Sequence, residues 1–170
     1  MTLTDLPGAR LDEVPVAAPS RSTAGLAELF ELFWHPVCTT AELDTAAPHP
    51  LAVRLLGREL AIARLDDGSY VAIGNRCIHR SARLSVGWVD GCAVRCAYHG
   101  WAFGADGRCR EIPSMPDGPI PERACVPSFE AVERYGFVWV RLDPGAGTSV
   151  PAHPAFERVE AAPGTMRIVH

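Results

Sequence analysis

The stretch from Asn75 to Trp101 constrains this chain more than any other, because it carries two short groups of metal-binding side chains. The first group reads Cys77-Ile-His79 and the second reads Cys96-Ala-Tyr-His99, with sixteen residues between them. Two loops that face each other would therefore supply two thiolates and two imidazoles. That donor set suits a zinc ion or an iron–sulfur cluster. Common zinc sites pair Cys with Cys and His with His at short spacing, so the pattern favours the cluster.

Around these ligands the sequence resembles the Rieske [2Fe–2S] domain of Rieske-type non-haem iron oxygenases. The resemblance covers about residues 30 to 142 and includes runs on both sides of the ligands. These runs are Cys77-Ile-His79-Arg80, Leu84-Ser85-Val86-Gly87, the segment 96–103, Asp106-Gly107-Arg108-Cys109 and Ile112-Pro113. The resemblance implies one [2Fe–2S] cluster, with Cys77 and Cys96 on one iron and His79 and His99 on the other.

The ligand set and its neighbours bear on the reduction potential. Two thiolates and two neutral imidazoles leave the diferric cluster formally neutral, whereas four thiolates leave it doubly negative, so the former accepts an electron more readily. Rieske proteins of respiratory chains carry two further cysteines and a serine near the cluster; the matching residues here are Ala82, Tyr98 and Trp101. Fewer hydrogen bonds to the cluster imply a lower potential, which suits electrons from a nicotinamide cofactor. Tyr98 and Trp101 are expected to shield the cluster, or Trp101 to fill the core.

The chain departs from the family pattern at three positions beside the ligands. Ile78 and Ala97 stand where proline is usual, and Ser81 stands where glycine is usual. None of the three is a ligand. Because proline fixes φ and glycine permits positive φ, these substitutions concern the shape of the two loops.

Charge and cysteine content limit the partners. The net charge of −4 argues against a nucleic-acid partner. No apolar run is long enough for a secretion signal or a membrane span, and the remaining cysteines lack the spacing of a disulfide framework, so we expect a reduced, cytoplasmic protein with no membrane partner. Those cysteines are Cys38, Cys92, Cys109 and Cys125. Four arginines surround the ligands in the sequence, either to dock an acidic electron donor or as a solvated rim. They are Arg76, Arg80, Arg83 and Arg95.

Short apolar segments between Gly, Pro and Asp turns predict an all-β fold, specifically a Rieske-type antiparallel β-sandwich with a small cluster-binding subdomain of two loops and a short N-terminal helix. The predicted strands are 34–37, 51–56, 59–65, 70–73, 91–95, 101–103, 108–112, 130–134 and 137–142. A helix over 24–33, capped by Thr23, is expected to pack its apolar stripe against the domain. Segments 41–50 and 113–127 are predicted as loops, with His35 structural and His49 exposed.

We expect a disordered tail over residues 1–23, the Rieske domain over 24–143, and over 144–170 a linker and the start of a missing or truncated catalytic domain. Within the last segment, 155–161 is expected to form a helical turn and 165–169 a strand. The resemblance implies an electron-transfer domain that takes electrons from a reductase or ferredoxin and passes them to a mononuclear iron, held by two His and one carboxylate.

That mononuclear iron site is expected on another chain or a missing segment. After the Rieske region only His153 and His170 remain, and neither has a second His at close spacing. Whether this chain alone is an enzyme therefore stays open. The alternatives are a free-standing Rieske ferredoxin and a zinc-stabilised binding module. The sequence does not identify the substrate or the electron donor.

Overall fold

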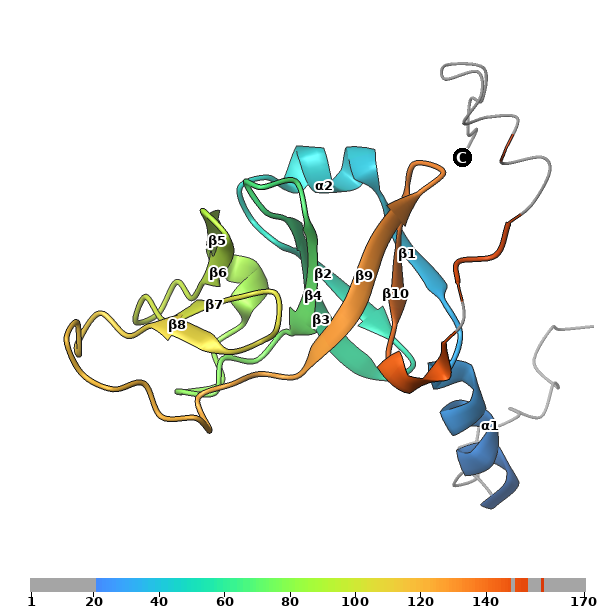
Figure 1. Ribbon diagram of the computed structural model, residues 1–170, viewed down its shortest axis with the longest axis horizontal. Coiled ribbons are helices and arrows are strands. Elements are labelled where there is room, and N and C mark those ends of the chain that lie inside the picture. Colours follow the sequence, from blue (N-terminus) through green and yellow to red (C-terminus); the bar gives the residue numbers. More distant parts are fainter. Residues whose placement is uncertain (1–20, 148, 153–156, 158–170) are drawn as a thin grey trace, which may run out of the picture.

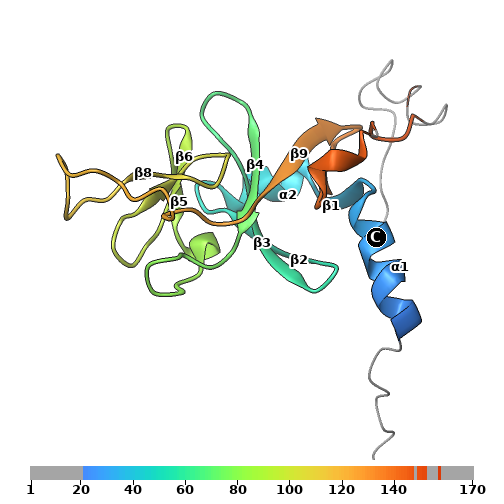
Figure 2. The same ribbon diagram turned by 60° about the horizontal axis from the view of Figure 1, so that its bottom comes forward.

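A computed structural model describes residues 21–147, 149–152 and 157. These residues form two antiparallel sheets with few helices, which confirms the predicted fold class. The strand order is β1-β10-β9-β4-β3-β2 in the six-stranded sheet and β5-β6-β7-β8 in the four-stranded sheet. The small sheet and helix α1 (Arg21–Glu31) lie at opposite ends of the molecule (Figures 1 and 2). Residues 1–20 of the expected tail over 1–23, nearly all of the turn over 155–161, and the strand over 165–169 lie outside the described residues. The last three residues of that expected tail, 21–23, are helical and belong to α1.

The remaining elements follow the predicted strands closely. The large sheet contains β1 (His35–Thr39), β2 (Leu51–Leu55), β3 (Arg58–Arg64), β4 (Tyr70–Gly74), β9 (Ser128–Arg134) and β10 (Phe137–Arg141). The small sheet contains β5 (Trp88–Asp90), β6 (Ala93–Arg95), β7 (Ala102–Phe103) and β8 (Cys109–Glu111). Helix α2 (Thr40–Ala46) and two 3₁₀ turns, Leu84–Val86 and Pro144–Ala146, complete the fold. Only β5 and the turn before it were not predicted among the elements that border the ligand loops.

Strands β3 and β4 are buried on both faces, and each face belongs to a different core. Successive side chains of a strand point to opposite faces, so Ala61 and Ala63 enter one core while Leu60 and Ile62 enter the other. The first core joins the two sheets and includes the predicted ligands Cys77 and Cys96. The second core lies between the large sheet and α2. Cys77 and Cys96 are thus buried where the two sheets contact each other.

The predicted loop over 41–50 is wrong, because its first part is helix α2. The N–H of Glu42 donates to the Thr39 hydroxyl at 3.1 Å, and the N–H of Thr39 donates to the Glu42 carboxylate at 2.7 Å. This reciprocal pair is a capping box, and Thr-x-x-Glu is its sequence signature. Leu43 is buried in the second core, which gives this short helix a tertiary anchor.

The expected packing of the first helix is also wrong. Helix α1 begins at Arg21, earlier than predicted, and projects away from both sheets (Figure 1). The four apolar residues of the predicted stripe, of which Phe33 lies just after the helix, are 45 to 56% exposed: Leu26, Leu29, Phe30 and Phe33. A polar contact holds the end of the helix: the Arg58 guanidinium donates to the Glu31 carboxylate at 2.8 Å. Among the described residues, none covers the stripe enough to bury it.

The buried thiol of Cys38 is expected to make the fold less stable at alkaline pH. This thiol is 7% exposed in the second core. Burial, and after it the Glu42 carboxylate, raises the pKa of Cys38 from 9.0 to about 11. A folded-state pKa that is raised gives a contribution to the free energy of unfolding that is complete below the unfolded pKa and is lost as pH rises through the folded pKa. We therefore expect stability to fall between pH 9 and 11.

Urea unfolding of the unsubstituted chain and of Cys38→Ala, followed by circular dichroism, tests this expectation. The variant should lose less stability between pH 9 and 11, whereas the two proteins should show the same pH slope between about pH 6 and 8. Equal slopes in the alkaline range would contradict the assignment to Cys38.

Candidate metal centre

The four predicted ligands lie on two loops that enter and leave the small sheet. The first loop connects β4 to β5 and carries Cys77 and His79; the second connects β6 to β7 and carries Cys96 and His99. In the first loop the N–H of Cys77 donates to the Ala82 carbonyl at 2.8 Å. The Cys77 carbonyl in turn accepts from the N–H of Ser81 at 2.8 Å.

The second loop repeats the same turn. The N–H of Cys96 donates to the Trp101 carbonyl at 2.9 Å, and the Cys96 carbonyl accepts from the N–H of Gly100 at 3.0 Å. In both loops the partners are the fifth and fourth residues after the cysteine. The fourth residue has a positive φ in each case, 55° at Ser81 and 73° at Gly100. The unequal spacing of Cys and His in the sequence concealed this equivalence.

The two loops bring the side chains together as a buried pair and an exposed pair. Cys77 and Cys96 are each 2% exposed, and the Cys96 thiol raises the pKa of the Cys77 thiol. The rings of His79 and His99 are exposed at the surface, with 4.5 Å between their centroids. Sulfur therefore lies toward the core and nitrogen toward solvent.

The protonation of these side chains reflects their surroundings. Burial in the first place, and Cys96 in addition, raise the pKa of the Cys77 thiol to about 11, although the backbone N–H groups of His79 and Arg80 oppose the rise. Those N–H groups would stabilise a thiolate once a metal replaces the proton. Desolvation, His99 and Arg80 together lower the pKa of His79. A lowered pKa favours the neutral imidazole, which is the form that binds metals.

The donors fit a cluster of two irons. Each iron of a Rieske cluster takes two protein ligands, either two sulfurs or two nitrogens, and the side chains lie in just such pairs. Within the described part of the chain, no three His, Cys, Asp or Glu side chains form a group suited to a single metal ion. All six cysteines are free thiols, so no disulfide occupies Cys77 or Cys96.

Two aromatic side chains cover the imidazoles. Trp101 is half-buried against the first core, and its ring stacks on His79 at a centroid distance of 4.8 Å with 8° between the planes. The Tyr98 ring lies 3.9 Å from that of His99 and is 60% exposed as a residue. Sequence reasoning named both residues but missed the stack, because Trp101 and His79 belong to different loops.

The four arginines around the ligands do not form one basic rim. Arg76 pairs with Glu59 at 2.9 Å. Arg95 turns inward and its guanidinium is engaged by two carboxylates. Among the described residues, no carboxylate forms an ion pair with Arg80 or Arg83. Only those two remain available to attract an acidic partner.

The other histidines of the domain contact backbone. A ring nitrogen of His35 lies 2.8 Å from the Phe30 carbonyl, and Nδ1 of His49 lies 2.6 Å from the Gly87 carbonyl. This arrangement confirms that His35 is structural and that His49, although exposed, has a partner. Neither residue joins the two ligand loops.

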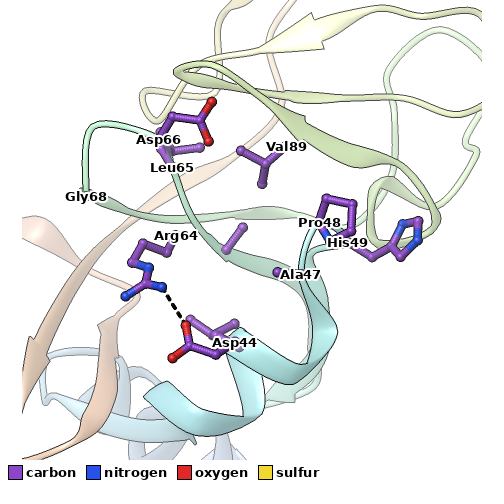
Figure 3. A pocket seen from close by; sticks show the side chains of 11 residues that line it. Asp44, Ala47, Pro48, His49, Arg64, Leu65, Asp66, Gly68 and Val89 are labelled. Atoms are coloured by element: carbon purple, nitrogen blue, oxygen red, sulfur yellow. Dashed lines mark hydrogen bonds and ion pairs between the residues drawn. The ribbon is translucent and has the colours of Figure 1, made fainter.

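A cavity of about 600 Å³ lies beside α2 and is lined by His49, Val89 and the hairpin between β3 and β4 (Figure 3). None of the four predicted ligands lines it. Its arginine, Arg64, is bonded to Asp44 at 2.6 Å, so these two wall charges compensate each other (Figure 3). The cavity adds no donor to the metal centre.

The matched residues Ser81 and Gly100 predict opposite effects of exchange. A side chain at positive φ costs about 1–2 kcal/mol, of which glycine's own entropy cost offsets part. Ser81→Gly should therefore raise the free energy of unfolding by a few tenths to about 1 kcal/mol. Gly100→Ala should lower it by about 1–3 kcal/mol, because its new carbon would also lie 2.9 Å from Pro113. Denaturant unfolding of both variants measures this; two effects of the same sign would contradict the equivalence of the loops.

Comparison with known proteins places the chain among characterised relatives. The family model for the Rieske [2Fe-2S] domain matches residues 33–130. Methylxanthine N1-demethylase NdmA of Pseudomonas putida is 50% identical over 119 residues, which cover 68% of this chain and 34% of that protein. Oxidoreductase NdmD of the same organism is 40% identical over 118 residues, covering 69% of this chain and 20% of that protein.

Solved structures agree with these matches. The structure of Pseudomonas putida NdmA with caffeine aligns with a TM-score of 0.72 at 47% identity, covering 75% of this chain and 38% of that one. Dicamba monooxygenase with non-heme iron and dicamba aligns with a TM-score of 0.65 at 30% identity, covering 74% and 38%. The chain spans about a third or less of the length of the curated relatives NdmA and NdmD. Within the described residues, no helix is long and apolar enough to cross a membrane.

Proposed function

This chain belongs to the Rieske [2Fe–2S] domain family, and from that premise we propose that it is the electron-transfer domain of an oxygenase-type oxidoreductase. A bound [2Fe–2S] cluster supplies one-electron transfer. The observation that carries the proposal is the pairing of two buried thiols with two exposed imidazoles on two loops that have the same turn geometry.

In this proposal Cys77 and Cys96 hold one iron, and His79 and His99 hold the other. The buried thiols keep water from the sulfur side. The exposed imidazoles would face a docked partner, and a bound cluster would exchange electrons on that side. Trp101 holds the ring of His79 by stacking, as outer contacts orient metal ligands in general.

The proposed electron donor is a reductase or a ferredoxin, and the proposed acceptor is a mononuclear iron in a catalytic domain outside the described residues. The relatives named as a demethylase and a monooxygenase support this role. Arg80 and Arg83 offer charge to an acidic donor, while Ile78 and Tyr98, exposed on the two ligand loops, offer apolar contact. We propose the cytoplasm as the compartment, because six free cysteines are typical of a reducing environment.

The match to NdmD, whose name is that of an oxidoreductase, supports a second candidate. The same domain can act as a carrier, either within a reductase or as a free-standing ferredoxin. The two candidates differ in their target. A carrier delivers electrons to a separate oxygenase, whereas a domain of an oxygenase delivers them to the iron of its own assembly.

Anaerobic purification followed by analysis of iron, labile sulfide and zinc tests the proposal. We expect two irons and two sulfides per chain, and visible absorbance that bleaches on chemical reduction and returns with air. The reduced chain is then mixed with a Rieske oxygenase that lacks its own cluster. Rapid reoxidation by that oxygenase would favour the carrier. A colourless chain that holds zinc and no iron would overturn both candidates.

A further inference from the structure

The residue before each ligand cysteine is an arginine, Arg76 or Arg95, and each of them reaches forward across its own loop. From these contacts we propose that Arg95 is a positioning residue, which holds the second ligand loop in its cluster-binding shape through the carbonyl of Gly100. Arg76 is the looser equivalent on the first loop. This inference rests on the proposed function, because it concerns the ligands of the cluster.

The guanidinium of Arg95 has three acceptors in three directions. Its Nε donates to Asp90 at 2.7 Å, one Nη donates to the Gly100 carbonyl at 2.8 Å, and the other donates to Glu111 at 2.7 Å. Asp90 and Glu111 belong to β5 and β8, the two outer strands of the small sheet. Because the donors of a guanidinium have fixed directions, these bonds determine where the group lies. The side chain is only 17% exposed.

These contacts close the second loop at both ends. Arg95 precedes Cys96 and Gly100 follows His99, so the bond between them spans the two ligands. The backbone of Arg95 has little freedom, because the backbone of Gly87 packs closely against it. A side-chain carbon added to Gly87 would lie 1.9 Å from the carbonyl oxygen of Arg95. A shift of the Gly100 peptide would therefore move His99, while Cys96 stays attached to the sheet.

The first loop shows the same contact in a weaker form. Arg76 donates to the carbonyl of Ser81, the residue equivalent to Gly100, at 3.5 Å. Its other contact is with a single carboxylate, Glu59, and its side chain is 53% exposed. Two loops with the same turn thus carry the same arginine in the same place. The tighter contact belongs to the loop in which histidine lies next to the bonded glycine.

The test compares Arg95→Gln, Arg95→Lys and Arg76→Gln with a matched control, Arg110→Gln. Arg110 also belongs to the small sheet, in β8, and the hydrogen bond and ion pair of its side chain go to Asp106 at 2.7 Å, outside both ligand loops. Three properties are measured: hydrogen exchange of the two turn amides in the substituted loop, the electron paramagnetic resonance spectrum of the reduced cluster, and its reduction potential. The turn amides are those of Cys96 and Gly100 in the second loop and those of Cys77 and Ser81 in the first loop.

Arg95→Gln should exchange the two amides about tenfold faster or more, because a charged hydrogen bond that holds the loop is lost. Its resonance spectrum should change and its potential should fall, since two carboxylates lose their counter-charge and disfavour an added electron. Arg95→Lys keeps the charge but not the three directed bonds. It should therefore retain a potential nearer to that of the unsubstituted protein and still exchange faster. Arg76→Gln should show a smaller change, and Arg110→Gln none.

Unchanged exchange and an unchanged resonance spectrum in both Arg95 variants would overturn the proposal, even if their thermal stability fell. If Arg95→Gln does not fold, Arg95→Lys and Arg76→Gln still test the proposal, because the turn amides of each must exchange faster than those of Arg110→Gln. The exchange measurement needs no cluster. A chain that binds no iron would therefore refute the proposed function, while the amides would still report whether Arg95 holds the loop.

Discussion

A Cys96→Ala chain is expected to emerge from purification colourless, with neither iron nor labile sulfide bound. The substitution replaces a proposed sulfur ligand with a methyl group at a position that is 2% exposed. Water has little access there to act as a substitute ligand. Cys109 lies in the same core, but its thiol is directed to the Glu111 carbonyl at 3.3 Å. One missing ligand should therefore abolish the cluster rather than weaken it.

Visible absorbance, iron and sulfide analysis, and far-ultraviolet circular dichroism measure this outcome. Cys125→Ala is the matched control, because Cys125 is exposed and lies on neither ligand loop. It should keep the full cluster content. Metal binding is coupled to folding, so the Cys96→Ala chain should also unfold at lower denaturant than the control. A Cys96→Ala protein with full absorbance and sulfide would refute the ligand assignment.

Phe103→Ala is expected to lower the free energy of unfolding by about 3–5 kcal/mol. Phe103 is 0% exposed and is the largest of the fully buried side chains in the described part of the chain. It belongs to the core that joins the two sheets and that also contains Cys77 and Cys96. Removing the ring leaves a cavity that this well-packed region cannot easily close. A loss of that size is a large share of the ~5–15 kcal/mol of a typical domain.

Denaturant unfolding gives the magnitude, and Phe33→Ala is the matched control. Phe33 is 48% exposed, so its removal should change the free energy of unfolding by less than about 0.5 kcal/mol. The cluster should also be released at lower denaturant in Phe103→Ala, because the same core supports both cysteines. Equal effects of the two substitutions would contradict the assigned cores.

The predicted strands succeeded where the signals were local. The turn Asp66-Asp67-Gly68 and the apolar residues on either side of it predicted the hairpin of β3 and β4 without reference to the rest of the chain. Helix α2 was missed although its capping box is visible in the sequence, because the polar residues after Thr39 were interpreted as loop. Strand β5 was missed for a different reason: it has only three residues and exists through its pairing with β6.

The sequence by itself determined the four candidate ligands, the class of cofactor that they suit and the positions of most strands. Only the tertiary structure decided how the two loops correspond and what the arginines beside them do. Arg80 and Arg95 look alike in the sequence, yet one is exposed and the other reaches Asp90 and Glu111. The physical reason is that strands and the turns between them depend on residues that are neighbours in the sequence. The partners of a side chain depend instead on which strands pair and in which register. Arg95 meets both carboxylates because β6 pairs with β5 and, through β7, is joined to β8.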